Sequence, residues 1–306
     1  MKQKLLLFVF AAFFAAKSFA QQDPQFTQYM YNMSIVNPAY TTGTENILNF
    51  GALYRTQWTD VDGGPKTFTG FVHMPVNDNV EVGLSFMNDN VGDIVKENVI
   101  TADFAYKLNF ANDLHLSFGL KAGVSLYDAT ISKLITIDPD PDFAEDLNKT
   151  YFNLGAGVYF NSDKFYVGLS VPTFIPQPHL DTTDKDNLWA REANTFLTGG
   201  YVFDLASKWK FKPAFMAKYM AGEPLSFDLT ANFLYNNFVE FGAGYRFEDA
   251  FSGLVNFKIT DIVRLGYAYD YTNSDFKDYA GSTHEIFLLF NIDTSTRGYD
   301  KSPRFF

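Results

Sequence analysis

The chain has 306 residues, a formal net charge of −11 and no cysteine. The lack of cysteine excludes disulfides, thiolate catalysis, cysteine-held zinc and a lipoprotein anchor, and the acidic balance argues against nucleic acid as a partner. Aromatic side chains make up 18% of the residues at a near-neutral mean hydropathy of −0.11. This combination favours alternating strands with aromatic girdles over membrane helices.

The first twenty residues have the three parts of an export signal. Lys2 and Lys4 form a basic start, residues 5–16 an apolar core, and Ser18-Phe19-Ala20 a small-x-small cleavage site. We therefore predict a signal peptide over residues 1–20 and a mature chain that begins near Gln21.

The next stretch, residues 23–40, reads DPQFTQYMYNMSIVNPAY and does not alternate like a strand. Asp23 can cap a helix that has Pro24 at its first position. Four apolar residues follow at helical spacing, namely Phe26, Tyr29, Met30 and Met33. The pattern predicts a short amphipathic helix within a helical or irregular, plug-like N-terminal segment, periplasmic or in the plug, over residues 21–46. It is interpreted either as a plug or lid that closes one mouth of the following domain or as a docking element or gate.

From Ile47 onward the chain contains about fourteen strand-sized runs that alternate apolar and polar residues. In the clearest pair, over residues 226–247, apolar residues fall on one face of each run and polar residues on the other, and an Asn-Asn step joins them. A soluble sandwich can alternate in the same way, but here the pattern recurs to the end of the chain. We predict an all-β fold, a transmembrane antiparallel β-barrel of about 14 strands over residues 47–291, with its apolar face in lipid. Residues 68–74 and 194–203 have ambiguous faces, and residues 292–306 form a predicted periplasmic tail.

Short and long links alternate along these runs. The tight turns fall at residues 76–79, 111–113, 161–163, 204–208, 236–237 and 260–261. The links between them are mostly longer, at residues 56–67, 89–98, 128–150, 172–193, 220–225 and 271–283. This asymmetry is typical of a multi-pass barrel in the cell outer membrane, with short turns in the periplasm. Both termini are then predicted to be periplasmic.

The polar face of the strands supplies the candidates for lining the lumen. They are Lys121, Lys210, Lys212, Asp228, Glu240, Arg246, Arg264 and Asp270. Such residues can form a solvated or mutually paired lining, and a selectivity filter is the alternative.

The sequence offers little for catalysis. Four histidines lie on separate runs and a loop without metal-ligand spacing, and neither GxSxG nor HExxH occurs. We predict no enzymatic activity, no cofactor and no metal site. A barrel enzyme would need a histidine with a nearby nucleophile at the membrane face.

Five motifs resemble the PorP/SprF family of Bacteroidetes outer-membrane proteins over most of the chain. They are QDPQFTQYMYN at residues 22–32, NPAY at 37–40, YRTQW at 54–58, Pro65 with Thr67, and GSTHEIFL at 281–288. Thr41-Thr42-Gly43 departs from the alanine or glycine that often follows NPAY in the family. The motif residues that are candidates for plug or partner contact are Asp23, Pro24, Phe26, Gln28, Tyr29, Asn32, Asn37, Pro38, Tyr40, Arg55 and Trp58.

The resemblance implies a component of the type IX secretion system that also supports gliding motility in many of these bacteria. It implies three partners: outer-membrane lipid, a periplasmic lipoprotein ring, and large secreted adhesins with type B C-terminal domains. A lumen of about fourteen strands can hold a plug but not a large folded adhesin. We therefore expect the chain to anchor or receive cargo, with residues 128–150 and 172–193 facing it. The alternative is a passive or fatty-acid-type outer-membrane channel.

Overall fold

The computed structural model describes residues 24–40, 47–133, 146–175, 177–178, 190–191, 193–221, 223–274 and 281–293. The predicted signal peptide, Asp23 and the tail beyond Asp293 lie outside these residues. So do residues 134–145 and most of 179–192, which belong to the two links that we expected to face cargo.

Fifteen strands form one continuous antiparallel sheet in the described residues. They are β1 (Ile47–Thr56), β2 (Lys66–Pro75), β3 (Val80–Val91), β4 (Val95–Asn109), β5 (His115–Ala129), β6 (Leu147–Asn161), β7 (Phe165–Val171), β10 (Asn194–Tyr201), β11 (Phe203–Ala206), β12 (Trp209–Met220), β13 (Ser226–Tyr235), β14 (Val239–Arg246), β15 (Ala250–Lys258), β16 (Val263–Thr272) and β17 (Ser282–Asp293). A separate pair joins β8 (Gln177–Pro178) and β9 (Ala190–Arg191).

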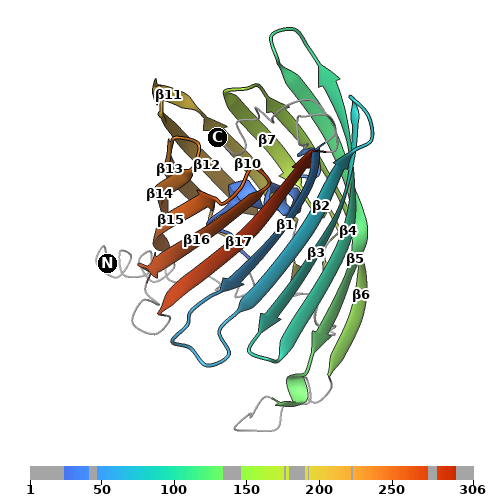
Figure 1. Cartoon of the computed structure of the whole chain (residues 1–306). Coiled ribbons are helices and arrows are strands. Elements are labelled where there is room, and N and C mark those ends of the chain that lie inside the picture. The colour runs from blue at the N-terminus through green and yellow to red at the C-terminus, as the bar shows by residue number, and fades with distance from the viewer. Residues whose placement is uncertain are drawn as a thin grey trace, which may run out of the picture.

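The sheet closes on itself because its first strand pairs with its last. β17 lies between β16 and β1 and pairs with both (Figure 1). β10 pairs with β7 on one side and β12 on the other, and β11 continues the course of β10 beyond Val202. The predicted antiparallel barrel of about 14 strands is therefore confirmed, with one position of the wall divided into two strands. Closure gives most strands a partner on both sides, while the part of β6 before Ala156 pairs only with β5 and β11 pairs only with β12 in the described residues.

The two faces of each strand differ as the alternation predicts. On β13, Asp228 and Asn232 are buried inside the barrel, while Leu229 and Tyr235 are exposed on its outer face. On β5, Lys121 points inward and the neighbouring Leu120 is 63% exposed. The two ambiguous runs follow the same rule, since Thr69, Phe71 and His73 of β2 and Thr198 of β10 face inward.

The links divide the barrel into a short-turn end and a long-loop end. At the short-turn end, the links cover residues 76–79, 110–114, 162–164, 207–208, 236–238 and 259–262. The long-loop end carries residues 57–65, 130–146, 172–193, 221–225 and 273–281, together with two tight turns at 92–94 and 247–249. β1 starts and β17 ends at the short-turn end.

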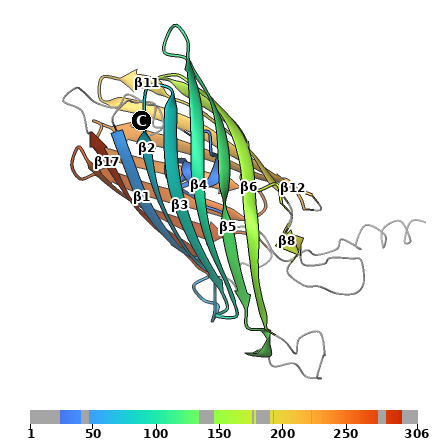
Figure 2. The same ribbon diagram turned by 90° about the vertical axis from the view of Figure 1, so that its right-hand side faces the viewer.

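The prediction of a long link over residues 89–98 is wrong. β3 and β4 continue through these residues and reverse direction only at 92–94, where Gly92 and Asp93 adopt positive φ angles of 67° and 53°. The run is polar, which reads as a loop in sequence, but its side chains pair across the strands, as when Asn88 Nδ2 donates to Asn98 Oδ1 over 2.8 Å. β4, β5 and β6, of 15 residues each, extend beyond the neighbouring strands (Figures 1 and 2).

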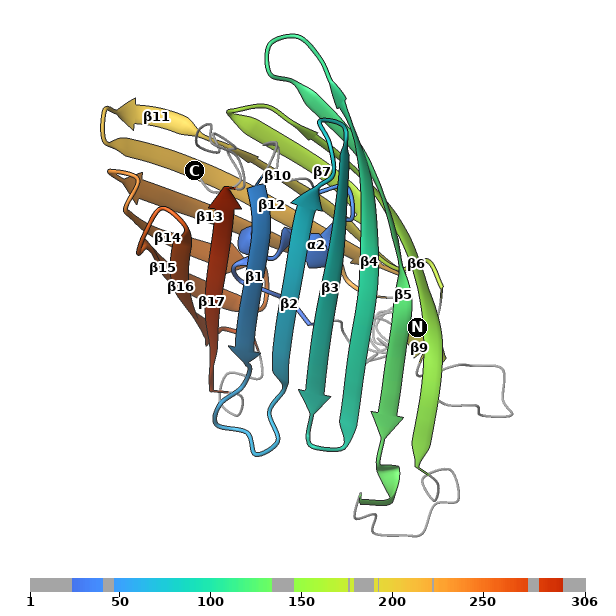
Figure 3. The same ribbon diagram turned by 45° about the vertical axis from the view of Figure 1, so that its right-hand side comes forward.

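Residues 24–40, called here the lumen segment, lie inside the barrel. Figure 3 shows α2 within the ring of strands, behind β2 and β3. The segment holds a 3₁₀ turn, η1 (Tyr29–Tyr31), and one α-helical turn, α2 (Met33–Val36). Most of its side chains are buried, polar ones included.

The predicted amphipathic helix from Asp23 is therefore wrong. Helical structure in the described residues begins only at Tyr29 and is interrupted at Asn32. An amphipathic helix needs one wet face, and a segment enclosed by the barrel wall has none, so local contacts with the wall decide its course. No helix in the described part of the chain is long and apolar enough to cross a membrane.

Candidate functional site

Three charged side chains from the wall meet near the long-loop end of β1, β16 and β17. Arg55 Nη2 lies 2.9 Å from Asp270 Oδ2, and Arg55 Nη1 lies 3.1 Å from Glu285 Oε2. All three side chains are at most 4% exposed. We call this group the carboxylate clasp. Buried charges are tolerated when they are paired and hydrogen-bonded, as these are.

The carboxylate clasp holds the start of the lumen segment. The backbone N–H groups of Thr27 and Gln28 donate to the two oxygens of Glu285 over 3.0 and 2.7 Å. The Thr27 hydroxyl donates to Asp270 over 2.7 Å and accepts from Arg55 Nη1 over 3.1 Å. Donors and acceptors thus match on both sides, and several of these bonds involve ionised groups, which are the stronger kind.

Charged side chains continue around the same part of the wall. Arg246 on β14 forms a bidentate pair with Asp228 on β13, with N···O distances of 2.8 and 3.1 Å. Around the wall from β13 through β14, β16 and β17 to β1, the order is therefore acid, base, acid, acid, base, and Arg55 on β1 pairs with both Glu285 and Asp270. In this sector the inward-facing residues are a mutually paired lining, which is the first of the two interpretations of the sequence.

A second cluster lies near the short-turn end of β14 and β16. The Tyr31 hydroxyl donates to Glu240, which also accepts from Asn232 Nδ2 over 2.9 Å and from Arg264 Nη1 over 3.4 Å. The Tyr31 ring stacks on Phe287 with a centroid distance of 4.4 Å. Two cations approach the same ring, Lys212 at 5.7 Å and Arg264 at 5.8 Å, a range in which cation–π attraction acts.

Lys121 joins the middle of the lumen segment to β4 and β5. Its amino group lies 2.7 Å from Asp103 Oδ1 and donates to the Ser34 carbonyl over 3.1 Å. Lys210, by contrast, is half-buried on β12 opposite Asp204 of β11, at the short-turn end. Of the eight predicted lining residues, Lys210 is the one that the structure places at the rim.

The end of the lumen segment lies against a different kind of wall, made of glycines on β5, β6 and β7. A Cβ added to Gly119 would lie 2.2 Å from the backbone nitrogen of Ala39 and the carbonyl carbon of Pro38. One added to Gly157 would lie 2.2 Å from Asn37 Oδ1. Backbone can approach this closely only where the wall has no side chain. We call Gly119, Gly157 and Gly168 the glycine cradle.

Hydrogen bonds fix the segment in the glycine cradle. Asn37 Nδ2 donates to the Val158 carbonyl over 3.1 Å, while Asn37 Oδ1 accepts from the Ala39 N–H over 2.8 Å. The Ser170 hydroxyl donates to the Val36 carbonyl over 2.8 Å. Tyr40 closes the arrangement with an edge-on contact to Tyr159, at a centroid distance of 5.8 Å.

The remaining motif candidates are distributed along the segment and one loop. Tyr29 is fully buried, Asn32 accepts from the Thr69 hydroxyl over 3.2 Å, Phe26 is buried and Pro24 is half-buried. Trp58 lies instead in the 57–65 loop at φ 55°, where its N–H donates to Thr283 Oγ1 over 3.4 Å. The structure therefore brings Arg55 to the lumen segment and places Trp58 at the long-loop rim.

Sequence reasoning missed two parts of this site. Glu285 was read only as one letter of a motif, although it is an acid on the inward face of a strand that otherwise points Phe287 and Leu289 inward. The glycines of the cradle were not among the predicted site residues. No group of three His, Asp or Glu side chains in the described residues is arranged to hold a metal ion.

Solved structures share the fold at low sequence identity. The CymD monoaromatic hydrocarbon channel matches with a TM-score of 0.51 and 12% identity, over 90% of this chain and 93% of that one. A mutant of the TodX monoaromatic hydrocarbon channel matches with 0.50 and 7%, over 86% and 94%. Omp33 of Acinetobacter baumannii matches with 0.49 and 10%, over 82% and 100%.

A comparison with curated proteins gave no match. The family model described as type IX secretion system membrane protein PorP/SprF matches residues 18–290. This range contains every motif that suggested the resemblance and every strand from β1 to β16. The chain belongs to the PorP/SprF family and is an outer-membrane β-barrel component of the type IX secretion system.

Proposed function

We propose that this chain receives and anchors large secreted adhesins with type B C-terminal domains at the outer membrane, beside a periplasmic lipoprotein ring, and does not conduct them. The observation that carries the proposal is the lumen segment, which lies inside the barrel and is bonded to its wall near both ends. Anchoring adhesins at the surface would also serve gliding motility. The role requires no catalysis.

The energetics support an anchor over a conduit. To clear the lumen, the segment would have to leave the carboxylate clasp, the Glu240 cluster and the glycine cradle together. Glu285 and Asp270 would then lose the hydrogen bonds that Thr27 and Gln28 donate to them. Losing hydrogen bonds to buried charged groups costs free energy. A barrel whose lumen stays filled by the segment can still bind cargo at its long-loop end.

We propose that the short-turn end faces the periplasm, which puts the start of β1 and the end of β17 there. Because the chain has no cysteine, single-cysteine variants report on this directly. Asp62→Cys in the 57–65 loop should react with a membrane-impermeant maleimide on intact cells. Asp163→Cys in the 162–164 turn should react only after the outer membrane is permeabilised. The reverse pattern would invert the proposed orientation.

The experiment for the proposed function compares the surface and secreted proteins of a strain lacking this chain with those of its parent, by mass spectrometry. Loss of one or a few large adhesins with type B C-terminal domains, while other exports persist, would support the proposal. Loss of every type IX cargo would indicate a core part of the machine instead. An unchanged set of exported proteins would refute both.

A passive or fatty-acid-type channel is the second candidate, favoured by the fold shared with CymD and TodX, which are named as monoaromatic hydrocarbon channels. It requires a path around the lumen segment. Wild-type protein in planar bilayers should then conduct steadily, whereas the anchor proposal expects conductance only after the carboxylate clasp is broken, as in Arg55→Ala.

A further inference from the structure

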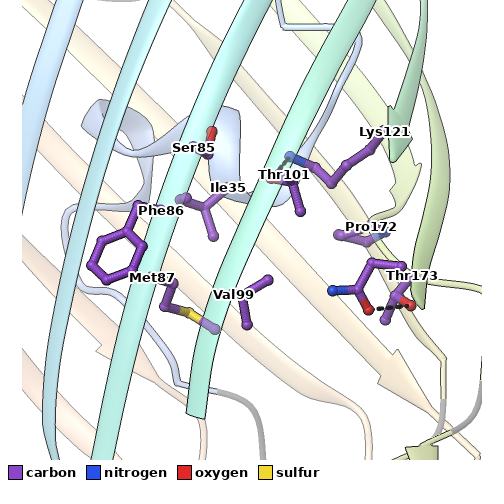
Figure 4. A pocket seen from close by; sticks show the side chains of 10 residues that line it. Ile35, Ser85, Phe86, Met87, Val99, Thr101, Lys121, Pro172 and Thr173 are labelled. Carbon is purple, nitrogen blue, oxygen red and sulfur yellow. Dashed lines mark hydrogen bonds between the residues drawn. The ribbon is translucent and has the colours of Figure 1, made fainter. Parts of the chain in front are cut away.

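A cavity of about 70 Å³ lies beside α2 inside the barrel. Its lining comes from the lumen segment (Ile35), from β3 and β4 (Ser85, Phe86, Met87, Val99, Thr101) and from β5 to the residues after β7 (Lys121, Asn153, Pro172, Thr173). Figure 4 shows Ile35 facing the same space as Met87 and Val99, with Pro172 and Thr173 on the far side. We call this cavity the lumen pocket.

The lumen pocket extends from α2 toward the long-loop end. Ser85 and Thr101 are paired across β3 and β4, and Met87 and Val99 form the next inward-facing pair toward the 92–94 turn. The Thr173 hydroxyl lies 3.4 Å from Asn153 Oδ1 and fixes the chain that leaves β7 against β6.

The chemistry of the pocket is apolar with one unused polar group. Ile35, Met87, Val99 and Pro172 supply apolar walls. The Lys121 charge is neutralised by Asp103 at 2.7 Å, so it does not select for an anion. The Ser85 side chain is 4% exposed and its hydroxyl has no hydrogen-bond partner among the described residues. This hydroxyl is therefore free to donate to a group bound in the pocket.

We propose that the lumen pocket binds one branched aliphatic side chain of an exported partner polypeptide, whose adjacent backbone carbonyl accepts from Ser85. The inference rests on the proposed function, and it names the place where cargo is held. The volume is several times the roughly 10–15 Å³ that one water needs and below the 150 Å³ of a cavity that takes benzene, which suits a small aliphatic group. Ile35 forms part of the pocket, so its occupant touches the lumen segment.

The test substitutes a larger side chain at an inward-facing position of β4 and makes the same substitution at the outward-facing neighbour as a control. Val99→Phe adds a ring on the inward face of β4, whereas Ile100→Phe adds one on the outward face, where Ile100 is 49% exposed. We expect Val99→Phe to lower surface retention of the affected adhesin at least tenfold, with unchanged barrel abundance in the outer membrane. Ile100→Phe and the enlarging variant Val99→Ala should retain it at wild-type levels.

A labelling measurement tests occupancy directly and does not depend on export. In Val99→Cys protein, methyl methanethiosulfonate should modify the thiol freely in cells that lack the adhesin and at least tenfold more slowly in cells that produce it. The same rate in both cells, with Val99→Phe cells exporting normally, would overturn the pocket while leaving the proposed function intact. If the deletion strain exports every protein normally, the proposed function fails and the pocket proposal fails with it.

Discussion

The lumen segment is held by two sectors of the same barrel in opposite ways. On β1, β16 and β17 the wall offers charge, and the carboxylate clasp takes up the N–H groups of Thr27 and Gln28. On β5, β6 and β7 the wall has glycines in place of larger residues, so the backbone at Pro38 and Ala39 packs directly against the glycine cradle. One sector binds by electrostatic pairing and the other by shape.

The difference shows how a barrel can fix the two ends of an irregular segment whose apolar side chains pack in one cluster with Leu53, Phe71 and Tyr159 of the wall. Charge pairing sets where the segment starts because a buried carboxylate needs specific donors. Shape sets where the segment ends, because its backbone can lie this close to the wall only where the wall residue has no Cβ. Substitutions in the two sectors should therefore lower the free energy of unfolding for different reasons, unpaired charge in one and steric overlap in the other.

The largest effect is expected from Arg55→Ala in the carboxylate clasp. It leaves Asp270 and Glu285 as close buried acids without their cation, and removing one partner of a buried ion pair costs about 3–5 kcal/mol. The free energy of unfolding in detergent, followed by heat-modifiable electrophoretic mobility, should fall by this amount. Protease sensitivity at the lumen segment should rise with it.

The triple variant Arg55→Ala, Asp270→Asn, Glu285→Gln serves as the matched control for this change. It removes the unpaired charges together with the cation, so most of the lost stability should return. Equal instability in the single and the triple variant would show that packing of Arg55, and not charge, holds the start of the lumen segment.

The glycine cradle should give the next largest effect. Gly119→Ala places a Cβ against backbone atoms of Pro38 and Ala39 at 2.2 Å, and overpacking of this kind costs about 1–3 kcal/mol. Gly253→Ala is the matched control, because a Cβ there meets nothing within 4 Å. Salt should not alter the Gly119→Ala loss. Equal stability of the two variants would mean that the end of the lumen segment is not seated on the wall.

The two sectors also differ in how far sequence could predict them. Alternation along β13 and β14 assigns Asp228, Glu240 and Arg246 to the inner face because the side-chain period of a strand is two. Their partners could not be predicted, since Arg55 and Glu285 are 230 positions apart and meet only when β1 pairs with β17. The resemblance placed Arg55 among the contact candidates but did not connect it to Glu285.

The errors of prediction have physical causes as well. The polar run at residues 89–98 reads as a loop because loops are usually polar, yet strands that rise beyond the apolar band can be polar on both faces. The spacing of Phe26, Tyr29, Met30 and Met33 matches a helix face, but inside a lumen every face is buried and helical spacing carries no weight. A glycine on the inward face of a strand does not reveal from sequence which segment will pack against it.

A smaller effect is expected from Tyr31→Phe, which sharpens the comparison within the charged sector. The change removes the hydroxyl that donates to Glu240 but keeps the ring on Phe287 and below Lys212 and Arg264. Since Glu240 retains Arg264 and Asn232, the loss should stay near 1.5 kcal/mol, the low end for a hydrogen bond to a charged group. A loss as large as that of Arg55→Ala would show that Tyr31, and not the carboxylate clasp, is the main charged contact of the lumen segment.

The smallest effect is expected from Lys164→Ala, which removes an ion pair of the same chemistry from the barrel surface. Lys164 pairs with Asp204 at the short-turn end, where the two side chains are 46% and 52% exposed. Water solvates the partner that remains, so the free energy of unfolding should change by about 0–1 kcal/mol and the difference should vanish in high salt. If this variant lost as much stability as Arg55→Ala, burial would not be what gives the carboxylate clasp its strength, and the contrast between the two sectors would lose its basis.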